Sequence, residues 1–213
     1  MSGCLSKPAN QQWLPVQPGA LYQYSNFGAA WVARRVELQT GTDFAAFVRS
    51  TILNPLGMTR SGHSITSLNG QTHAQGWLNL STPSPFNGVN PYPAGNLRAS
   101  ANDLAKFMIM WTNGGVGANG TRVLSQASVD YALTQQNSTI SGFGFFWQRR
   151  ATESGRWLWG HDGLLQASAT CTVLTIDPAT REGVAIMVNG KCGDTPALFT
   201  AIEDRVYRTM QTL

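Results

Sequence analysis

Two short polar motifs in this sequence could take part in chemistry. Tyr24 and Asn26 form a Tyr-x-Asn motif, and His161 opens a His-Asp-Gly motif that continues through Asp162 and Gly163. A phenol has an ordinary pKa near ~10, so it removes a proton at neutral pH only beside a cation or in a concerted step. An asparagine amide offers both a donor and an acceptor. The alternative is structural, with Tyr24 packed in the fold and Asn26 capping a helix.

Other catalytic patterns are missing from the sequence. No segment matches Gly-x-Ser-x-Gly, the nucleophile turn of α/β-hydrolases, and no His-Glu-x-x-His motif or paired Cys or His spacing indicates a metal site. We therefore expect neither a metal nor another cofactor. The cysteines Cys4, Cys171 and Cys192 can form at most one disulfide. His63 and His73 are interpreted as packed or surface residues.

The composition favours a folded globular protein. The 213 residues are 42% hydrophobic and 12% charged, which is enough to form a core. The net charge of +4 comes from scattered Arg and Lys, so no basic run predicts a nucleic-acid partner. No window is apolar enough to span a bilayer, and the first residues do not form a signal peptide.

The first part of the chain, to about residue 140, predicts helices and one long loop. Asn26 could cap a helix over residues 26–39 that ends at Gly41. Helices are also expected at 43–53, at 100–112 behind a Ser100 capping box, and at 125–135. Residues 58–96 are rich in Ser, Thr, Asn, Gly and Pro and predict an ordered loop over a cleft.

Residues 141–213 predict an antiparallel sheet and a final helix. Aromatic or β-branched runs at 143–148, 156–160, 167–176 and 183–189 are separated by short turns. A helix that starts at Thr195-Pro196 has Leu198, Ile202 and Val206 on one face, which could cover the sheet. The fold class is therefore α+β, with three or four strands.

Three motifs in this order resemble the serine β-lactamase and penicillin-binding-protein superfamily, which includes class C β-lactamases, D-alanyl-D-alanine carboxypeptidases and related carboxylesterases. They are residues 18–26, Asn54-Pro55-Leu56-Gly57-Met58 and Gly160-His161-Asp162-Gly163. Residues 93–97 also match, so the resemblance covers nearly the whole chain. It implies one β-lactamase/transpeptidase-like domain over 1–213, in which 1–140 and 141–213 are the two regions.

The resemblance also implies roles for the motif residues. Tyr24 would be the general base toward a nucleophilic serine and later the acid, and Asn26 would orient the substrate carbonyl. His161 stands where many relatives carry the lysine of Lys-Thr-Gly and would give electrostatic support. Gly163 would let substrate lie along the strand edge, and the N–H of Leu164 would belong to the oxyanion hole.

Specificity is expected to depend on Asp162 and on aromatic residues. Asp162 replaces the hydroxyl residue that helps to bind a carboxylate in penicillin-recognising relatives, so it should repel such substrates and favour an esterase-like preference. The aromatic residues Trp77, Tyr92, Trp147 and Trp159 could bind an apolar acyl group or could fill the core. Core filling is expected for at least half of them.

The nucleophile of the superfamily, the serine of Ser-x-x-Lys, is not found in this sequence. Cys4-x-x-Lys7 has similar spacing but stands too close before Tyr24. We therefore expect a fold that is incomplete at its N-terminus, with an exposed sheet edge and uncovered apolar surface.

The sequence thus leaves two hypotheses. One is a serine hydrolase of a small ester or amide, completed by an N-terminal segment or by self-association. The other is a non-catalytic binding module. The resemblance implies a secreted or periplasmic location, which no motif in the chain tests.

Overall fold

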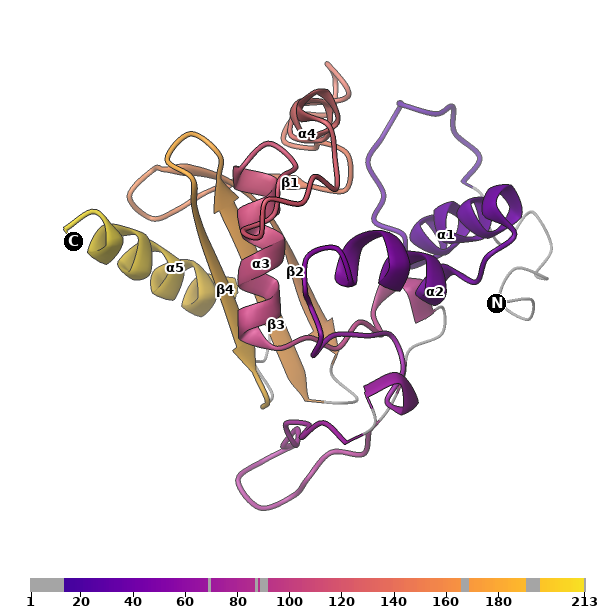
Figure 1. The fold of residues 1–213 in the computed structure, drawn as a ribbon. Coiled ribbons are helices and arrows are strands. Elements are labelled where there is room, and N and C mark those ends of the chain that lie inside the picture. Colours follow the sequence, from indigo (N-terminus) through magenta and orange to yellow (C-terminus); the bar gives the residue numbers. More distant parts are fainter. Residues whose placement is uncertain are drawn as a thin grey trace.

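The chain folds into a helical, loop-rich part followed by a four-stranded antiparallel sheet (Figure 1). The computed structural model describes residues 14–68, 70–86, 88, 92–165, 169–190 and 196–212. Its helices are α1 (Asn26–Thr40), α2 (Phe44–Val48), the π-helix η2 (Arg49–Leu53), the short turns η3 (Thr66–Leu68) and η4 (Tyr92–Ala94), α3 (Ala101–Thr112), α4 (Gln126–Ala132) and α5 (Pro196–Met210). The strands are β1 (Gln148–Ala151), β2 (Trp157–Leu165), β3 (Thr170–Asp177) and β4 (Glu182–Val188). The predicted α+β class is confirmed.

The first two helices begin at polar caps, although the first cap is not the predicted residue. Ser25, not Asn26, caps α1, because its extended backbone lets Oγ accept a hydrogen bond from the N–H of Gly28 at 3.0 Å. Gly41 ends the helix in the left-handed conformation, with φ of 68°, as predicted. Asp43 caps α2 and accepts two backbone N–H bonds.

The predicted capping box at α3 is only half formed. The Ser100 hydroxyl accepts from the N–H of Asp103 at 3.2 Å, as expected. The Asp103 carboxylate does not return to Ser100, because it accepts bonds from Arg60 N and Ser61 Oγ, both at 2.8 Å, and pairs with Lys106. Asp103 is 2% exposed, so this acceptor is satisfied inside the fold and joins α3 to the loop after α2.

The sheet begins later than predicted. Residues 143–148 form a tight turn closed by a bridge between Phe143 and Gln148, and Phe146 has a φ of 64°, which no strand residue can adopt. β1 therefore starts at Gln148, and β2 extends beyond the predicted end at Gly160 to Leu165. The four strands pair in chain order. Cys171 on β3 is disulfide-bonded, and the other two cysteines lie outside the described residues.

Alternating side chains of the sheet contact α3 on one face and α5 on the other. Met108 of α3 packs with Ile176, Trp147 and Ala132 in one buried cluster. Leu158 and Val184 form another buried cluster with Tyr207 of α5. The site described below includes His161 of β2, a strand of the sheet that lies between α3 and α5.

The prediction for the last helix is wrong about its inner face. Leu198, Ile202 and Val206 are 57%, 38% and 37% exposed, so this apolar stripe faces away from the sheet. The face of α5 against the sheet carries Glu203, Asp204 and Tyr207, each 2% exposed or less. Thr195, the predicted start, lies outside the described residues.

Polar partners on the sheet explain why carboxylates can be buried there. Glu203 forms an ion pair with Arg150 at 2.6 Å and accepts from Thr175 Oγ1 at 2.8 Å. Asp204 accepts a hydrogen bond from the N–H of Ser154 at 3.0 Å. Buried charges are tolerated only when they are paired and hydrogen-bonded in this way.

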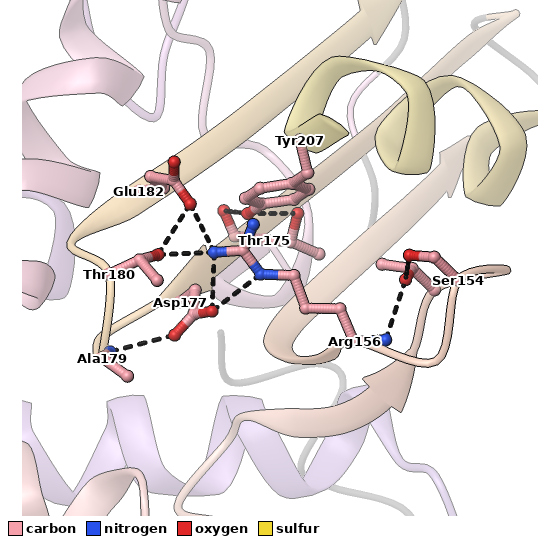
Figure 2. Close-up of polar contacts among 9 residues, drawn as sticks. Ser154, Arg156, Thr175, Asp177, Ala179, Thr180, Glu182 and Tyr207 are labelled. Atoms are coloured by element: carbon pink, nitrogen blue, oxygen red, sulfur yellow. Dashed lines mark hydrogen bonds and ion pairs between the residues drawn. The ribbon is translucent and has the colours of Figure 1, made fainter. Parts of the chain in front are cut away.

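Arg156 adds to the polar contacts between the sheet and α5 (Figure 2). Its guanidinium lies 4.5 Å from the centroid of the Tyr207 ring and donates to the carboxylates of Asp177 and Glu182. Tyr207 in turn donates its hydroxyl to the carbonyl of Thr175 at 3.1 Å. The docking of α5 is therefore largely polar.

Candidate active site

The structure brings Tyr24 and His161 together. Tyr24 lies just before α1 and His161 lies on β2, yet their ring centroids are 6.1 Å apart, with an interplanar angle of 41°. Tyr24 is 51% exposed, so a ligand can reach its hydroxyl. The two motifs that the sequence marked therefore meet at one place on the surface.

One hydrogen bond fixes the state of the His161 ring. Nδ1 lies 2.6 Å from the backbone carbonyl oxygen of Asp162. A carbonyl oxygen can only accept, so Nδ1 carries the hydrogen, and Nε2 of a neutral ring is left with a free lone pair. The ring can then accept a bond through Nε2, or can carry a positive charge when protonated.

The edge of β2 beside His161 has an open stretch. β1 pairs with β2 only from Trp157 to Gly160, so among the described residues no strand covers that edge from His161 to Leu165. Alternate N–H groups of such a stretch point outward and can donate to a ligand. Leu164, the predicted oxyanion donor, lies in this stretch and is 49% exposed.

Gly163 faces a side chain of the next strand. A Cβ at this position would lie 2.8 Å from Oγ1 of Thr172 on β3, so the Thr172 side chain would have to move. The predicted contact of Gly163 with substrate stays a prediction.

The electrostatic surroundings oppose a Tyr24 phenolate. Partial burial raises the pKa of Tyr24, and the carboxylate of Asp162 and the neighbouring Tyr22 raise it further. Each of these influences disfavours the negative form of the phenol. Tyr24 can therefore act as a base at neutral pH only in a concerted step or beside a cation that these residues do not supply.

Asp162 and Asn26 are exposed residues close in sequence to Tyr24 or His161. Asp162 is exposed, and strand alternation places its side chain on the α5 side of the sheet, opposite to that of His161. Its charge nevertheless acts on Tyr24. Asn26 is the first residue of α1 and is also exposed, two residues from Tyr24.

Two of the predicted aromatic residues lie in the core. Trp147 is 7% exposed and makes an edge contact with Trp111, with centroids 5.1 Å apart. Trp159 packs against the same cluster. Their described contacts are those of the core-filling role.

The other two lie on loops away from the Tyr24–His161 pair. The backbone of Trp77 bonds to Asn189, after β4. Tyr92 donates to Asp43 at 3.4 Å, beyond the opposite end of α1 from Tyr24. Burial, together with Asp43 and Glu37, raises the pKa of Tyr92 to about 12, so this phenol is a poor base.

A model of the family described as Beta-lactamase matches residues 7–207. The chain belongs to the Beta-lactamase family. It is 28% identical over 200 residues to penicillin-binding protein 4 of Amycolatopsis lactamdurans, an alignment that covers 86% of this chain and 50% of that protein. The chain spans half or less of the length of the curated relatives that it matches.

Solved structures show the same fold at low sequence identity. The D-amino acid amidase from Ochrobactrum anthropi SV3 in complex with L-phenylalanine superposes with a TM-score of 0.71 at 19% identity, over 92% of this chain and 59% of that one. The octameric penicillin-binding protein homologue from Pyrococcus abyssi gives 0.68 at 24% identity, over 84% and 41%. The expected β-lactamase-like fold is therefore confirmed.

A cavity of about 520 Å³ lies next to the end of β2 in this Beta-lactamase-family chain. Leu165, Thr172 and Met187 of the sheet form one wall, and the loop residues His73 and Phe86 belong to the other. Arg60 and Arg98 also line it, together with further polar and apolar residues. The loop was predicted to cover a cleft, but nothing in its sequence indicated which residues line it.

The described residues hold no group of three or more His, Cys, Asp or Glu that could bind a metal ion. Within the same residues, no helix is both long and apolar enough to cross a bilayer.

Proposed function

We propose that this chain carries the general base and an oxyanion-hole donor of a serine hydrolase that cleaves ester or amide bonds through an acyl-enzyme. The observation that supports the proposal is the pairing of Tyr24 with His161 beside the open stretch of β2. In this role Tyr24 takes the proton of the nucleophile and later returns one to the leaving group. The N–H of Leu164 donates to the oxyanion, and Asn26 orients the substrate carbonyl.

The nucleophile and its lysine come from a Ser-x-x-Lys segment outside these 213 residues. The raised pKa of Tyr24 supports this requirement, because the phenol lacks a nearby cation in the described structure. A lysine ammonium placed beside Tyr24 would favour the phenolate and offset the effect of Asp162.

Two exposed features support completion by a further segment or by self-association. β4 is an edge strand of the described sheet. The apolar stripe of α5 is exposed as well. Edges and stripes of this kind are sites of association, and the penicillin-binding protein homologue from Pyrococcus abyssi is an octamer.

The preferred substrate is an ester without a carboxylate near the scissile bond. The Asp162 carboxylate acts on Tyr24 and would repel the carboxylate of a penicillin-type substrate. Asp162→Thr should therefore raise nitrocefin turnover relative to p-nitrophenyl acetate turnover in the completed enzyme, while an unchanged ratio would contradict the preference.

A non-catalytic binding module is the second candidate. It is favoured by the absence of Ser-x-x-Lys together with the raised pKa of Tyr24. The described residues could then form hydrogen bonds to a ligand but would lack the nucleophile of the superfamily.

Covalent labelling tests the proposal. The purified chain, alone and co-expressed with a segment that carries Ser-x-x-Lys, is treated with a fluorophosphonate probe, and the intact mass is recorded. We expect no adduct on the chain alone and one adduct on the serine of the added segment. Labelling should slow strongly with Tyr24→Phe and remain unchanged with the exposed control Tyr131→Phe. A completed complex without any adduct would favour the binding module.

A further inference from the structure

We propose that Tyr22 is a positioning residue, which holds Tyr24 against His161 by clamping the segment before α1 onto β1. The catalytic meaning of this placement rests on the proposed function. The contacts themselves do not, because they are made within the described chain.

The first part of the clamp is a ring stack. Tyr22 lies on Phe143 with centroids 3.8 Å apart and an interplanar angle of 19°. Phe143 belongs to the tight turn before β1 and is bridged to Gln148. Stacked rings of this kind contribute more than their buried area alone. The stack therefore fastens an otherwise irregular segment to the start of the sheet.

The second part of the clamp is polar and leads directly to the site. Gln148 Nε2 donates to the Tyr22 hydroxyl at 3.5 Å. In the sheet, Gln148 is paired with Gly160, the residue before His161. The side chain of Gln148 thus contacts Tyr22, two residues before Tyr24. Its backbone pairs with Gly160, next to His161.

A separate anchor holds the same segment further upstream. Asn137 Nδ2 donates to the carbonyl oxygen of Gly19 at 3.2 Å. Asn137 is itself fixed, because its Oδ1 accepts from the N–H groups of Thr139 and Ile140 at 2.8 and 3.0 Å. Residues 19–22 are therefore held at two points.

Tyr24 needs such support because its own contacts are few. The residues from 14 to 25 form no helix or strand, and Tyr24 is half exposed with a single described ring contact, to His161. A base displaced by about 1 Å can lose on the order of 100-fold in rate. The Ser25 cap anchors the chain just after Tyr24, and Tyr22 anchors it on the other side.

The test measures the placement of Tyr24 directly by NMR of the full chain with ¹³Cζ-tyrosine. The wild type should show a ring-to-ring NOE between Tyr24 and His161, and the Tyr24 ring protons should show the ring-current shift of a nearby imidazole. Tyr22→Leu should lose both, whereas Tyr22→Phe, which keeps the stack but not the bond from Gln148, should weaken them less. Tyr131→Leu is the matched control, since Tyr131 is 61% exposed and contacts Phe145 instead.

A second variant covers the case in which Tyr22→Leu disturbs the fold. Phe143→Leu removes the other half of the stack and should give the same loss, and the double variant should be no worse than either single one. In the completed enzyme, Tyr22→Leu should lower kcat by about 10- to 100-fold with KM within about twofold. Retention of the NOE and of the ring-current shift in both single variants would refute the proposal. Failure of acyl-enzyme formation would refute the proposed function but leave this result standing.

Discussion

Arg156 offers a sharp test of the polar layer beneath α5 (Figure 2). Its side chain is 15% exposed, pairs with Asp177 at 2.7 Å and with Glu182, and stacks on Tyr207. Arg156→Met keeps an unbranched apolar stem but leaves two carboxylates without their cation. Breaking a buried pair costs about 3–5 kcal/mol, and because Glu182 is 22% exposed we expect about 2–4 kcal/mol here.

The assay is urea and thermal unfolding followed by circular dichroism. For a chain of this size the expected loss lowers Tm by about 5–15 °C. The matched control is Arg149→Met, because Arg149 lies 5.0 Å over the exposed ring of Trp157 and is in no described ion pair. It should cost no more than about 1 kcal/mol. If Arg156→Met falls within about 1 kcal/mol of this control, the ion pairs of Arg156 do not stabilise the fold and the reasoning is wrong.

Other consequences can be checked on the same protein. The Thr180 hydroxyl and Arg156 lower the pKa of Glu182 below its ordinary value of 4.5. The stability that Glu182 contributes is therefore complete above pH 4.5 and is lost as the pH falls through its pKa in the folded protein. Urea unfolding at pH 6 and pH 3 should show a smaller loss of stability in acid for Glu182→Gln than for the wild type, and equal losses would contradict this. Asp162→Thr should lower the pKa of Tyr24 in an NMR titration, because it removes a carboxylate that raises that pKa, whereas Asp130→Thr should not. Gly160→Ala should cost about 1–3 kcal/mol in unfolding experiments, because the new Cβ would lie 2.7 Å from a backbone oxygen, and a neutral effect would show that β2 and β3 can separate there.

The order and type of the elements could largely be predicted from the sequence. Gly41 and Asp43 mark helix ends through their own backbone and hydrogen-bonding chemistry, which is local. The start of β1 could not be predicted, because residues 143–148 have the composition of a strand but turn back at Phe146. The inner face of α5 was also missed, since hydrophobic periodicity identifies an apolar stripe but not what it faces.

The candidate site was predictable only in part, and for a physical reason. The Tyr-x-Asn and His-Asp-Gly motifs led to Tyr24 and His161, which the structure brings together. Tyr22 lies inside the first motif but had no role assigned to it, Gln148 belongs to no motif, and their contact joins distant parts of the chain. The alternating pair Tyr22 and Tyr24 was the one signal in the sequence that could have suggested a shared role.

The exposed stripe of α5 bears on the proposed completion by a further segment or by self-association. The Arg150–Glu203 ion pair and a hydrogen bond from Ser154 to Asp204 join the helix to the sheet. A buried pair adds little net stability, however, because desolvation offsets much of the attraction. The apolar stripe of Leu198, Ile202 and Val206 is meanwhile left toward solvent, at four-residue spacing along one side of the helix. Polar contacts therefore help to set where α5 lies. Covering the exposed stripe would add stability by removing its apolar surface from water. A segment or a second subunit that covers this stripe and the edge of β4 would stabilise the sheet that positions His161. Folding of the sheet and completion of the site would then be coupled.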